Sequence, residues 1–432
     1  MSLTRREWML AAGAVPFQLK GIAAGTAQAP GGVRAATPSP LPLNVGAPHS
    51  LPDKASFGSV KGTYLNSAGS HPRSAGSIAL IKKAAAAEVG ESDGFRPSEK
   101  RVRENFAKLI NADVDEIALV PSTQIGESFV AAALGLPEKG AHVVSDHLHF
   151  VGSQMMYTDM TKRGLEVTWV KMKDGRIPFE DLDRAIVKGK TRLVAVSATA
   201  MVNGFEHDLK RVCEAAHAKG AMVYADIIQA AGNAPVDVKD WGVDATCCAT
   251  YKWLMSAGTA FLYVRRSSLA QMRPPFYHWQ QESTPLPTTH MYPFDSPGTR
   301  IVDGYTQRPG PEGMFSMAYE PNIVTLAGLE YSLPYIATIG VQKIQAHAQR
   351  LTERLKEELP RRGYPLLTPR NARSPIVTVV AEKAERLAPA FSAANVQVTT
   401  RWNHIRISVS VFNDMDDVEH LLEVFPAKKS TA

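Results

Sequence analysis

Short apolar runs recur along the chain between longer amphipathic stretches, and glycines mark many of the turns. Apolar runs of this kind are typical of strands buried in a parallel sheet. Their alternation with helical patterns, such as one from near Asp208 to Gly220, predicts an α/β fold with a mostly parallel sheet flanked by helices. The strand candidates are Ile117–Val120, His142–Ser145, Leu165–Lys171, Arg192–Ser197, Ala221–Ala225, Ala245–Ala249 and Ala260–Val264. Periodicity alone leaves the direction of the last of these strands open.

The pattern changes in the C-terminal part of the chain. Met272–Pro321 is rich in proline, glycine and aromatic residues and is too long for a plain connector, which predicts a functional loop or an oligomer contact. Ile323–Leu359 has the period of two long helices, broken near Gly340. A strand over Ile405–Val411 and a helix over Asp416–Phe425 complete a smaller C-terminal α+β unit.

Two of the predicted strands are each followed by a charged residue, Asp226 and Lys252. Because ligands of parallel sheets bind outside the carboxyl ends of the strands, we expect this carboxylate and this amine to open into one crevice. The pair suits pyridoxal 5′-phosphate, which needs an amine for a Schiff base and an anion at its pyridine nitrogen. The alternative is a surface lysine and a solvated aspartate that merely end two strands. The ordered set Asp226, Gln229, Tyr251 and Lys252 favours the cofactor.

With this set, the chain resembles the class V aminotransferases of the fold-type I pyridoxal-phosphate enzymes, which include cysteine desulfurases, isopenicillin N epimerase and kynureninase. The resemblance runs over Tyr64–Phe425 and is most specific at Asp226, Gln229 and the run Tyr251–Leu254, whose Tyr-Lys-aromatic-Leu form is closest to kynureninase. It implies a large cofactor-binding domain over residues 61–320 and a small C-terminal domain over residues 321–432.

The resemblance also implies roles around the cofactor. Lys252 is expected to be the catalytic lysine that forms the Schiff base, and Asp226 to hold the pyridine nitrogen. Gln229 is expected to reach the phenolic oxygen of the ring, and Tyr251 to add a hydroxyl to the phosphate. Arg406 matches the arginine that grips the substrate carboxylate through its bidentate fork, although an arginine between isoleucines also suits an edge strand.

Two further groups are expected to touch the cofactor. Thr123 and Gln124 match the phosphate-binding turn, where a strand ends and a helix begins with free N–H groups. A simple helix cap at this turn is the alternative, and both can hold because a cap and a phosphate use the same donors. Phe150 is expected to cover one face of the ring by analogy with kynureninase, with His147 or His149 as substitutes.

The implied function is transformation of an L-α-amino acid through a Schiff base with the cofactor and a carbanion, by transamination or by carbon–sulfur or carbon–carbon lyase chemistry. No cysteine follows Cys248, so a persulfide-forming desulfurase is not expected. An amino-acid epimerase and a non-catalytic binding or scaffold protein are the alternatives. Departures from the family pattern motivate the scaffold: Ala249 where many relatives have serine, no asparagine within Ser197–Met201, and no Gly-Thr at Met317–Asn322.

The composition of the chain and its N-terminal sequence bear on which other binding sites and which cellular location are expected. The net charge of +6 comes from interspersed residues, so no nucleic-acid site is expected, and three cysteines make no disulfide framework. No metal site and no membrane span are expected, because suitable ligand spacing and long apolar runs are missing. Residues 1–29 contain a twin-arginine pattern at Thr4–Leu10 and an Ala-Gln-Ala site, which predicts export to the periplasm, with a cytoplasmic protein as the alternative. Residues 30–60 are expected to form a linker and N-terminal segment, and the family resemblance implies a homodimer.

Overall fold

A computed structural model describes residues 50–90, 95–278, 281, 308–315 and 322–425. The strands are β1 (Thr63–Tyr64), β2 (Ile117–Val120), β3 (His142–Asp146), β4 (Glu166–Val170), β5 (Thr191–Ser197), β6 (Met222–Asp226), β7 (Ala245–Ala249), β8 (Ala260–Val264), β9 (Ile376–Val380), β10 (Val396–Gln397), β11 (Thr399–Arg401) and β12 (His404–Ser408). The helices are α2 (Ala75–Glu88), α3 (Glu99–Leu109), α4 (Thr123–Ala133), α5 (Val151–Thr161), α6 (Phe179–Ala185), α7 (Leu209–His217), α8 (Val238–Trp241), α9 (Gly310–Phe315), α10 (Ile323–Ile339), α11 (Val341–Arg361), α12 (Ala388–Ala393) and α13 (Met415–Val424).

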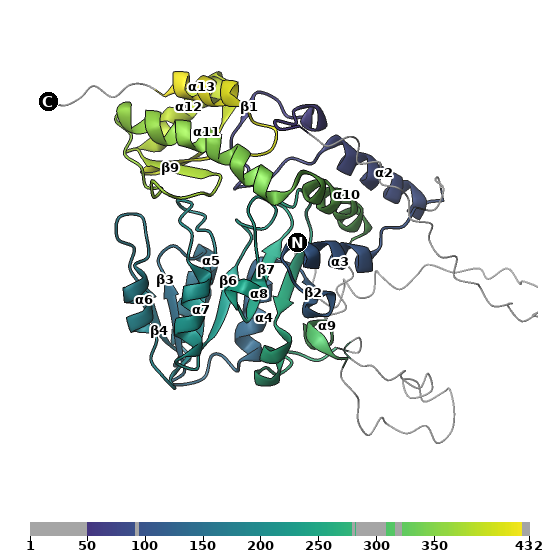
Figure 1. Cartoon of the computed structure of the whole chain (residues 1–432), viewed down its shortest axis with the longest axis vertical. Coiled ribbons are helices and arrows are strands. Elements are labelled where there is room, and N and C mark those ends of the chain that lie inside the picture. The colour runs from purple at the N-terminus through teal and green to yellow at the C-terminus, as the bar shows by residue number, and fades with distance from the viewer. Residues whose placement is uncertain (1–49, 91–94, 279–280, 282–307, 316–321, 426–432) are drawn as a thin grey trace, which may run out of the picture. The chain divides into compact units, whose positions relative to one another are not determined.

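The central feature is a seven-stranded sheet in the order β2-β8-β7-β6-β5-β3-β4, with helices packed along it (Figure 1). The pairs from β7 through β4 are parallel, and β8 runs antiparallel to both β7 and β2. Strands β6 and β7 are buried over their whole lengths, which explains why they are apolar without alternation. The predicted α/β fold with a mostly parallel sheet is confirmed, and the direction of β8 is settled as antiparallel.

Helix α7 shows how local sequence sets these elements. The carboxylate of Asp208 accepts a hydrogen bond from the N–H of Arg211 at 3.1 Å and so caps the helix start. Apolar residues of α7 lie on one buried face against β6. Gly220 has a φ of 80°, a left-handed conformation that only glycine adopts readily, and it leads the chain into β6.

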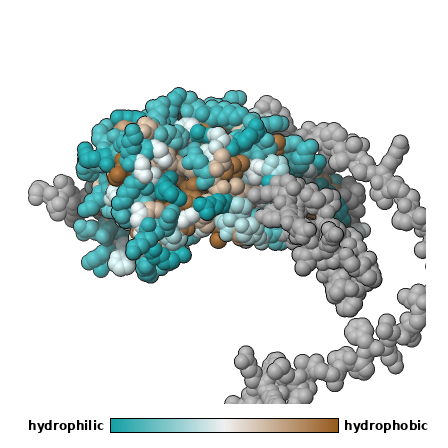
Figure 2. Space-filling view, turned by 90° about the horizontal axis from the view of Figure 1, so that it is seen from below, coloured by the Kyte–Doolittle hydropathy of each residue, from teal (hydrophilic) through white to brown (hydrophobic). Residues whose placement is uncertain are grey.

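The C-terminal part has its own core. Strands β11, β12 and β9 form an antiparallel sheet, and α11 and α13 pack beside it around a separate cluster of buried apolar residues. Strand β1 pairs in parallel with β10, so the start of the described chain joins this part. The face in Figure 2 is mostly hydrophilic, with hydrophobic residues gathered toward its middle. No comparison tests the domain boundaries at residues 60 and 320, which stay predictions.

Helices α10 and α11 meet at Gly340, where the sequence predicted a break, and lie at 75° to each other. Helix α10 packs against α2 and α3. In the described part of the chain no single helix has the length and apolar character needed to cross a membrane, and the bent pair α10–α11 meets that requirement only when both helices are counted together.

Candidate functional site

Asp226 and Lys252 come together at the carboxyl edge of two neighbouring strands. Asp226 is the last residue of β6 and is paired in register with Cys247 of the parallel strand β7. Lys252 follows the end of β7 by three residues, because β7 ends at Ala249. Both side chains are buried, and each contributes electrostatically to the pKa of the other. The two groups that the sequence places at neighbouring strand ends therefore lie near each other at one edge of the sheet.

The amine of Lys252 is buried without a hydrogen bond or an ion pair to any residue of the described ranges. Its Nζ lies 5.6 Å from the ring centroid of Tyr251. Burial lowers the pKa of Lys252 to about 8; Asp226 opposes this shift and the charge of Arg406 adds to it. A buried amine that loses its proton this readily can act as a nucleophile and as a base.

The carboxylate of Asp226 is held by one backbone group. Its Oδ1 accepts a hydrogen bond from the N–H of Ile228 at 2.9 Å. Burial raises the pKa of Asp226 to about 6, while this hydrogen bond and the positive charges of His149 and Lys252 restrain the rise. Asp226 is therefore mostly ionised at neutral pH and can neutralise a further cation beside it.

The strand-to-helix turn at Thr123 presents anion-binding groups to this region. Ser122 caps α4, since its Oγ accepts from the N–H of Ile125 at 3.2 Å, and Thr123 Oγ1 accepts from the N–H of Ala249 at 2.8 Å. Among the described residues, none accepts from the N–H groups of Thr123 and Gln124. These two donors at the N-terminus of an eleven-residue helix suit a phosphate. The cap by Ser122 therefore leaves these two donors available, and the phosphate site stays a prediction.

Phe150 lies beside this turn. A Cβ placed on Gly152 would come within 2.6 Å of Phe150 Cε1 and 2.7 Å of Gln124 Oε1, so both side chains pack over Gly152. Gln124 Nε2 also donates to the carbonyl of Gly152 at 3.1 Å, which joins α4 to α5. Of the two substitutes considered for Phe150, His147 is exposed and His149 is buried with both ring nitrogens hydrogen-bonded.

Gln229 connects two segments that are distant in sequence. Its Nε2 donates to the carbonyl of Ala68 at 3.1 Å, and its Oε1 accepts from Trp253 Nε1 at 3.0 Å. The N–H of His71 donates to the carbonyl of Tyr251 at 3.0 Å. Residues 65–71 therefore cross the site, which sequence analysis missed. The contacts of Ala68 and His71 to Gln229 and Tyr251 use backbone groups, and these leave no signal in the sequence.

Arg406 is a buried guanidinium without a carboxylate partner in the described parts of the chain. Its side chain is 7% exposed and donates only to the carbonyl of Met201 at 3.3 Å and to Thr399 Oγ1 at 3.2 Å. Its Nε is buried and makes no hydrogen bond to a described residue. Burial lowers the pKa of Arg406 to about 10, and repulsion by Arg401 adds to this. Such a group suits the carboxylate of a bound small molecule.

Tyr251 interacts with both Lys252 and Arg406. It is 40% exposed, and its burial and the charge of Asp226 raise its pKa above the ordinary value, while Arg406 opposes this rise. Tyr251 therefore keeps its proton at neutral pH and can donate a hydrogen bond. The effect of Arg406 on this pKa and the distance of 5.6 Å between Lys252 Nζ and the centroid of the Tyr251 ring place the three side chains in one region.

Together these residues fit pyridoxal phosphate. The buried amine of Lys252, which pairs with no described residue, and the ionised carboxylate of Asp226 are the two groups that the cofactor requires, and they interact at one edge of the sheet. The open N–H groups at the start of α4 suit its phosphate. The structure does not test the assigned roles of individual side chains, so these roles stay predictions.

The structure describes only some of the segments in which the sequence departs from the family pattern. No asparagine occurs in Ser197–Met201, and Asn203 does not replace it, because its Nδ2 donates to the carbonyls of Gly175 and Leu367 at 2.7 and 3.1 Å. Residues 317–321 lie outside the described residues. Within the described ranges no cluster of three or more His, Cys, Asp or Glu side chains is arranged to hold a metal ion.

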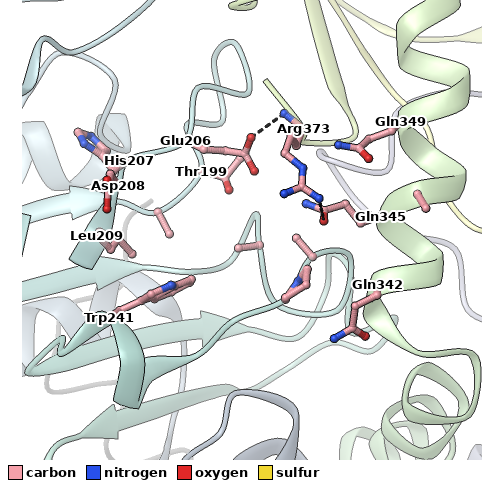
Figure 3. A pocket seen from close by; sticks show the side chains of 15 residues that line it. Thr199, Glu206, His207, Asp208, Leu209, Trp241, Gln342, Gln345, Gln349 and Arg373 are labelled. Carbon is pink, nitrogen blue, oxygen red and sulfur yellow. Dashed lines mark hydrogen bonds between the residues drawn. The ribbon is translucent and has the colours of Figure 1, made fainter. Parts of the chain in front are cut away.

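A separate polar pocket of about 710 Å³ lies between α11 and the loops that follow β5 (Figure 3). Gln342, Gln345 and Gln349 of α11 point toward it, and the N–H of Arg373 donates to Glu206 Oε2 at 2.7 Å across it. Neither Lys252 nor Asp226 lines this pocket.

Comparisons with known proteins agree with the geometry. The model of the family "Aminotransferase class-V" matches residues 95–421. The "Uncharacterized aminotransferase YcbU" of Bacillus subtilis is 26% identical over 329 residues, which are 76% of this chain and 82% of that protein.

Solved structures show the same fold at low sequence identity. The cysteine desulfurase CsdA of Escherichia coli is 18% identical, has a TM-score of 0.73, and the match covers 87% of this chain and 98% of that one. The cystine C–S lyase C-DES, solved with its product cysteine persulfide, is 17% identical with a TM-score of 0.72, and the match covers 85% and 98% of the two chains.

Proposed function

Because this chain belongs to the class V aminotransferase family of pyridoxal-phosphate-dependent enzymes, we propose that it removes the α-proton of an L-α-amino acid and completes a transamination or a lyase reaction. The observation that supports this proposal most strongly is the buried amine of Lys252, which pairs with no residue in the described ranges and interacts with the carboxylate of Asp226. Arg406 adds a buried cation that suits the substrate carboxylate.

Each of these residues has a physical task in the proposed reaction. Pyridoxal phosphate, when bound, supplies an electron sink for the electrons left on the α-carbon. The amine of Lys252 would hold the cofactor and, once free of it, would take the α-proton at Nζ; its lowered pKa of about 8 suits it to this task near neutral pH. Asp226 neutralises the ring cation. Arg406 fixes the carboxylate, which orients the bond to be broken over the crevice.

The cysteines argue against a sulfur relay through a protein thiol. The chain has only Cys213, Cys247 and Cys248, and all three are buried. Burial raises the pKa of Cys213 to about 12, and it raises the pKa values of the other two thiols as well. A thiol that does not ionise is a poor nucleophile. If the substrate is a sulfur amino acid, we propose that the carbon–sulfur bond is cleaved without a persulfide on this chain.

Purified protein tests the proposal. We expect a visible absorbance band that is lost in Lys252→Ala, and an amino acid that changes this band while keto acid, ammonia or sulfide is released. Inversion of the amino acid without any product would show an epimerase instead. A colourless protein that is unaffected by added cofactor would contradict the proposal. Substitution of all three cysteines by alanine is the control, and it should preserve turnover.

We also propose a homodimer that surrounds this site. Apolar side chains next to the phosphate turn are exposed: Ile125 of α4 is 38% exposed, and Val151 and Met155 of α5 are 54% and 69% exposed. The hydrogen bond from Gln124 to Gly152 joins the two helices that carry them. An exposed apolar cluster beside a site is typical of a subunit contact. Analytical ultracentrifugation should show a dimer that Met155→Asp weakens, and a monomeric wild-type protein would contradict this.

Finally, we propose export through the twin-arginine route. The pattern at Thr4–Leu10 supports this, and a pathway that carries folded proteins suits an enzyme that acquires its cofactor before transport. Replacing Arg5 and Arg6 by lysine should retain the protein in the cytoplasm, as followed by fractionation and by the N-terminal sequence of the mature chain. Equal distribution of the wild-type and the double variant would contradict export.

A further inference from the structure

A buried ion pair lies behind the candidate pyridine-nitrogen partner. Glu127 of α4 is fully buried, and its Oε1 lies 3.0 Å from Nε2 of His149. The hydroxyl of Ser153 donates to the other carboxylate oxygen of Glu127 at 2.5 Å. The second ring nitrogen of His149, Nδ1, lies 2.9 Å from the hydroxyl of Ser197. Both ends of the pair are therefore fixed by hydrogen bonds.

This pair is directed at Asp226. Ser197 is the last residue of β5 and is paired in register with Asp226 of β6, so the two side chains leave the same face of the sheet. The positive charge of His149 lowers the pKa of Asp226, whereas the negative charge of Glu127 raises it, and the effect of His149 is the larger. The cationic member of the pair therefore acts on Asp226 more strongly than the anionic member does.

The protonation of His149 depends on its acidic neighbours. Burial alone would lower the pKa of His149, but the attraction of Glu127, Asp146 and Asp226 outweighs burial and raises the pKa above its usual value. Because a carboxylate only accepts hydrogen bonds, the proton on Nε2 lies toward Glu127. Without the charge of Glu127, His149 would lose the largest part of this attraction and would become neutral at a lower pH.

Other ionisable groups surround the pair, and none of them replaces Glu127. Asp146 Oδ2 lies 3.1 Å from Nε2 of His207, a residue that lines the polar pocket of Figure 3. Tyr157 and Tyr224 face Glu127, and burial followed by the charge of Glu127 raises their pKa values well above the ordinary range, so both are neutral. Lys252 interacts with Asp226 from the segment that follows β7, the strand on the other side of β6 from β5.

A buried ion pair of this kind is weak evidence for stability, because taking both charges out of water offsets most of their attraction. Its placement suggests a different role. We propose that Glu127 and His149 are positioning residues that keep Asp226 ionised against the cofactor ring, and so keep the pyridine nitrogen protonated. This inference rests on the proposed function, since it requires the cofactor to bind opposite Asp226.

The charges predict an order among three variants. Glu127→Gln removes the group that keeps His149 charged, so Asp226 loses its cationic neighbour. His149→Gln is more severe, because it leaves the negative charge of Glu127 uncompensated near Asp226. The double variant removes both charges and should be no worse than Glu127→Gln. A merely structural role would instead make the double variant the most damaged.

The ring nitrogen can be followed directly by nitrogen NMR of isotope-labelled pyridoxal phosphate. In the wild-type holoenzyme the nitrogen should be protonated at neutral pH. In Glu127→Gln it should shift toward the unprotonated position, and the affinity of the cofactor-free protein for pyridoxal phosphate should fall roughly tenfold, which corresponds to one pKa unit. The pH at which the ring nitrogen loses its proton should fall in the order wild type, Glu127→Gln, His149→Gln.

A matched control separates this effect from general damage. Glu330 is also a buried carboxylate held by a cation, since its Oε1 lies 2.7 Å from Nη2 of Arg101, and it is located on α10. Glu330→Gln should leave the nitrogen signal and the cofactor affinity unchanged. If Glu127→Gln does not fold, His149→Gln and the double variant still test the order.

The experiment distinguishes a failure of this inference from a failure of the proposed function. A wild-type protein that binds no pyridoxal phosphate would overturn the proposed function itself. A wild-type ring nitrogen that is protonated and stays so in Glu127→Gln and His149→Gln would overturn only the role of the pair. A double variant clearly worse than His149→Gln would also overturn it.

Discussion

Replacement of Arg406 by glutamine should impair catalysis without destabilising the fold. In the cofactor-free chain the guanidinium is 7% exposed and has no carboxylate partner among the described residues, so its burial is poorly compensated. Removing this charge should leave the free energy of unfolding unchanged or raise it by about 1 kcal/mol. The bound substrate, in contrast, would lose the partner of its carboxylate.

The size of the catalytic loss follows from the burial of the site. Removing one member of a buried ion pair costs about 3 kcal/mol or more, which is roughly a 100-fold fall in kcat/KM. Steady-state kinetics and thermal unfolding of the same preparation measure both quantities. Arg401→Gln is the control, because Arg401 is an exposed cation on the neighbouring strand β11, and its kcat/KM should change little. An Arg406→Gln protein that is less stable but has unchanged kcat/KM would show a structural arginine and refute the reasoning.

Three further predictions concern the packing and charge of the site. The pKa of Lys252 is about 8 in the folded chain and 10.5 when unperturbed, so the unfolded state binds more protons between these two pH values and stability rises with pH there. Lys252→Met should therefore stabilise the cofactor-free protein by about 3 kcal/mol below pH 8. A gain in stability that persists above pH 10.5 would contradict this. Thr123→Ala leaves the N–H of Ala249 unpaired and should cost about 1–3 kcal/mol in thermal unfolding, whereas Thr123→Ser should cost little. A Cβ on Gly126 would lie 2.5 Å from Cys247 Sγ, so Gly126→Ala should lower the free energy of unfolding by about 1–3 kcal/mol. Adding Cys247→Ala should recover part of this loss, and a double variant no more stable than Gly126→Ala would refute the clash.

Much of the central sheet was predictable because five of its strands, β2, β3, β6, β7 and β8, are buried over their whole length. Such strands are uninterrupted apolar runs, and β2, β7 and β8 have the predicted bounds. The break at Gly340 was predictable from a glycine between two helical periods, and it has a φ of 87°. The direction of β8 was not predictable, since a buried strand has the same composition whether its neighbours run parallel or antiparallel.

The residues of the candidate site were also predictable only in part. Asp226 and Lys252 were found because each is a charged residue at or just after the end of a buried strand, and the structure places both at one edge of the sheet. The pair Glu127–His149 was missed, although Glu127 occupies a position of α4 that is completely buried, where the helical period calls for an apolar residue. A charged residue at a helix position that should be apolar can be noticed in the sequence. Its partner His149 cannot, because tertiary packing and not sequence spacing brings the two side chains together.

The most direct test of the account is to locate the covalent attachment of the cofactor. The purified holoprotein is reduced with borohydride, digested and analysed by mass spectrometry. The account predicts a phosphopyridoxyl group on the peptide that contains Lys252, and none in a Lys252→Ala protein. Attachment at a different lysine, or no attachment in a protein loaded with pyridoxal phosphate, would contradict it.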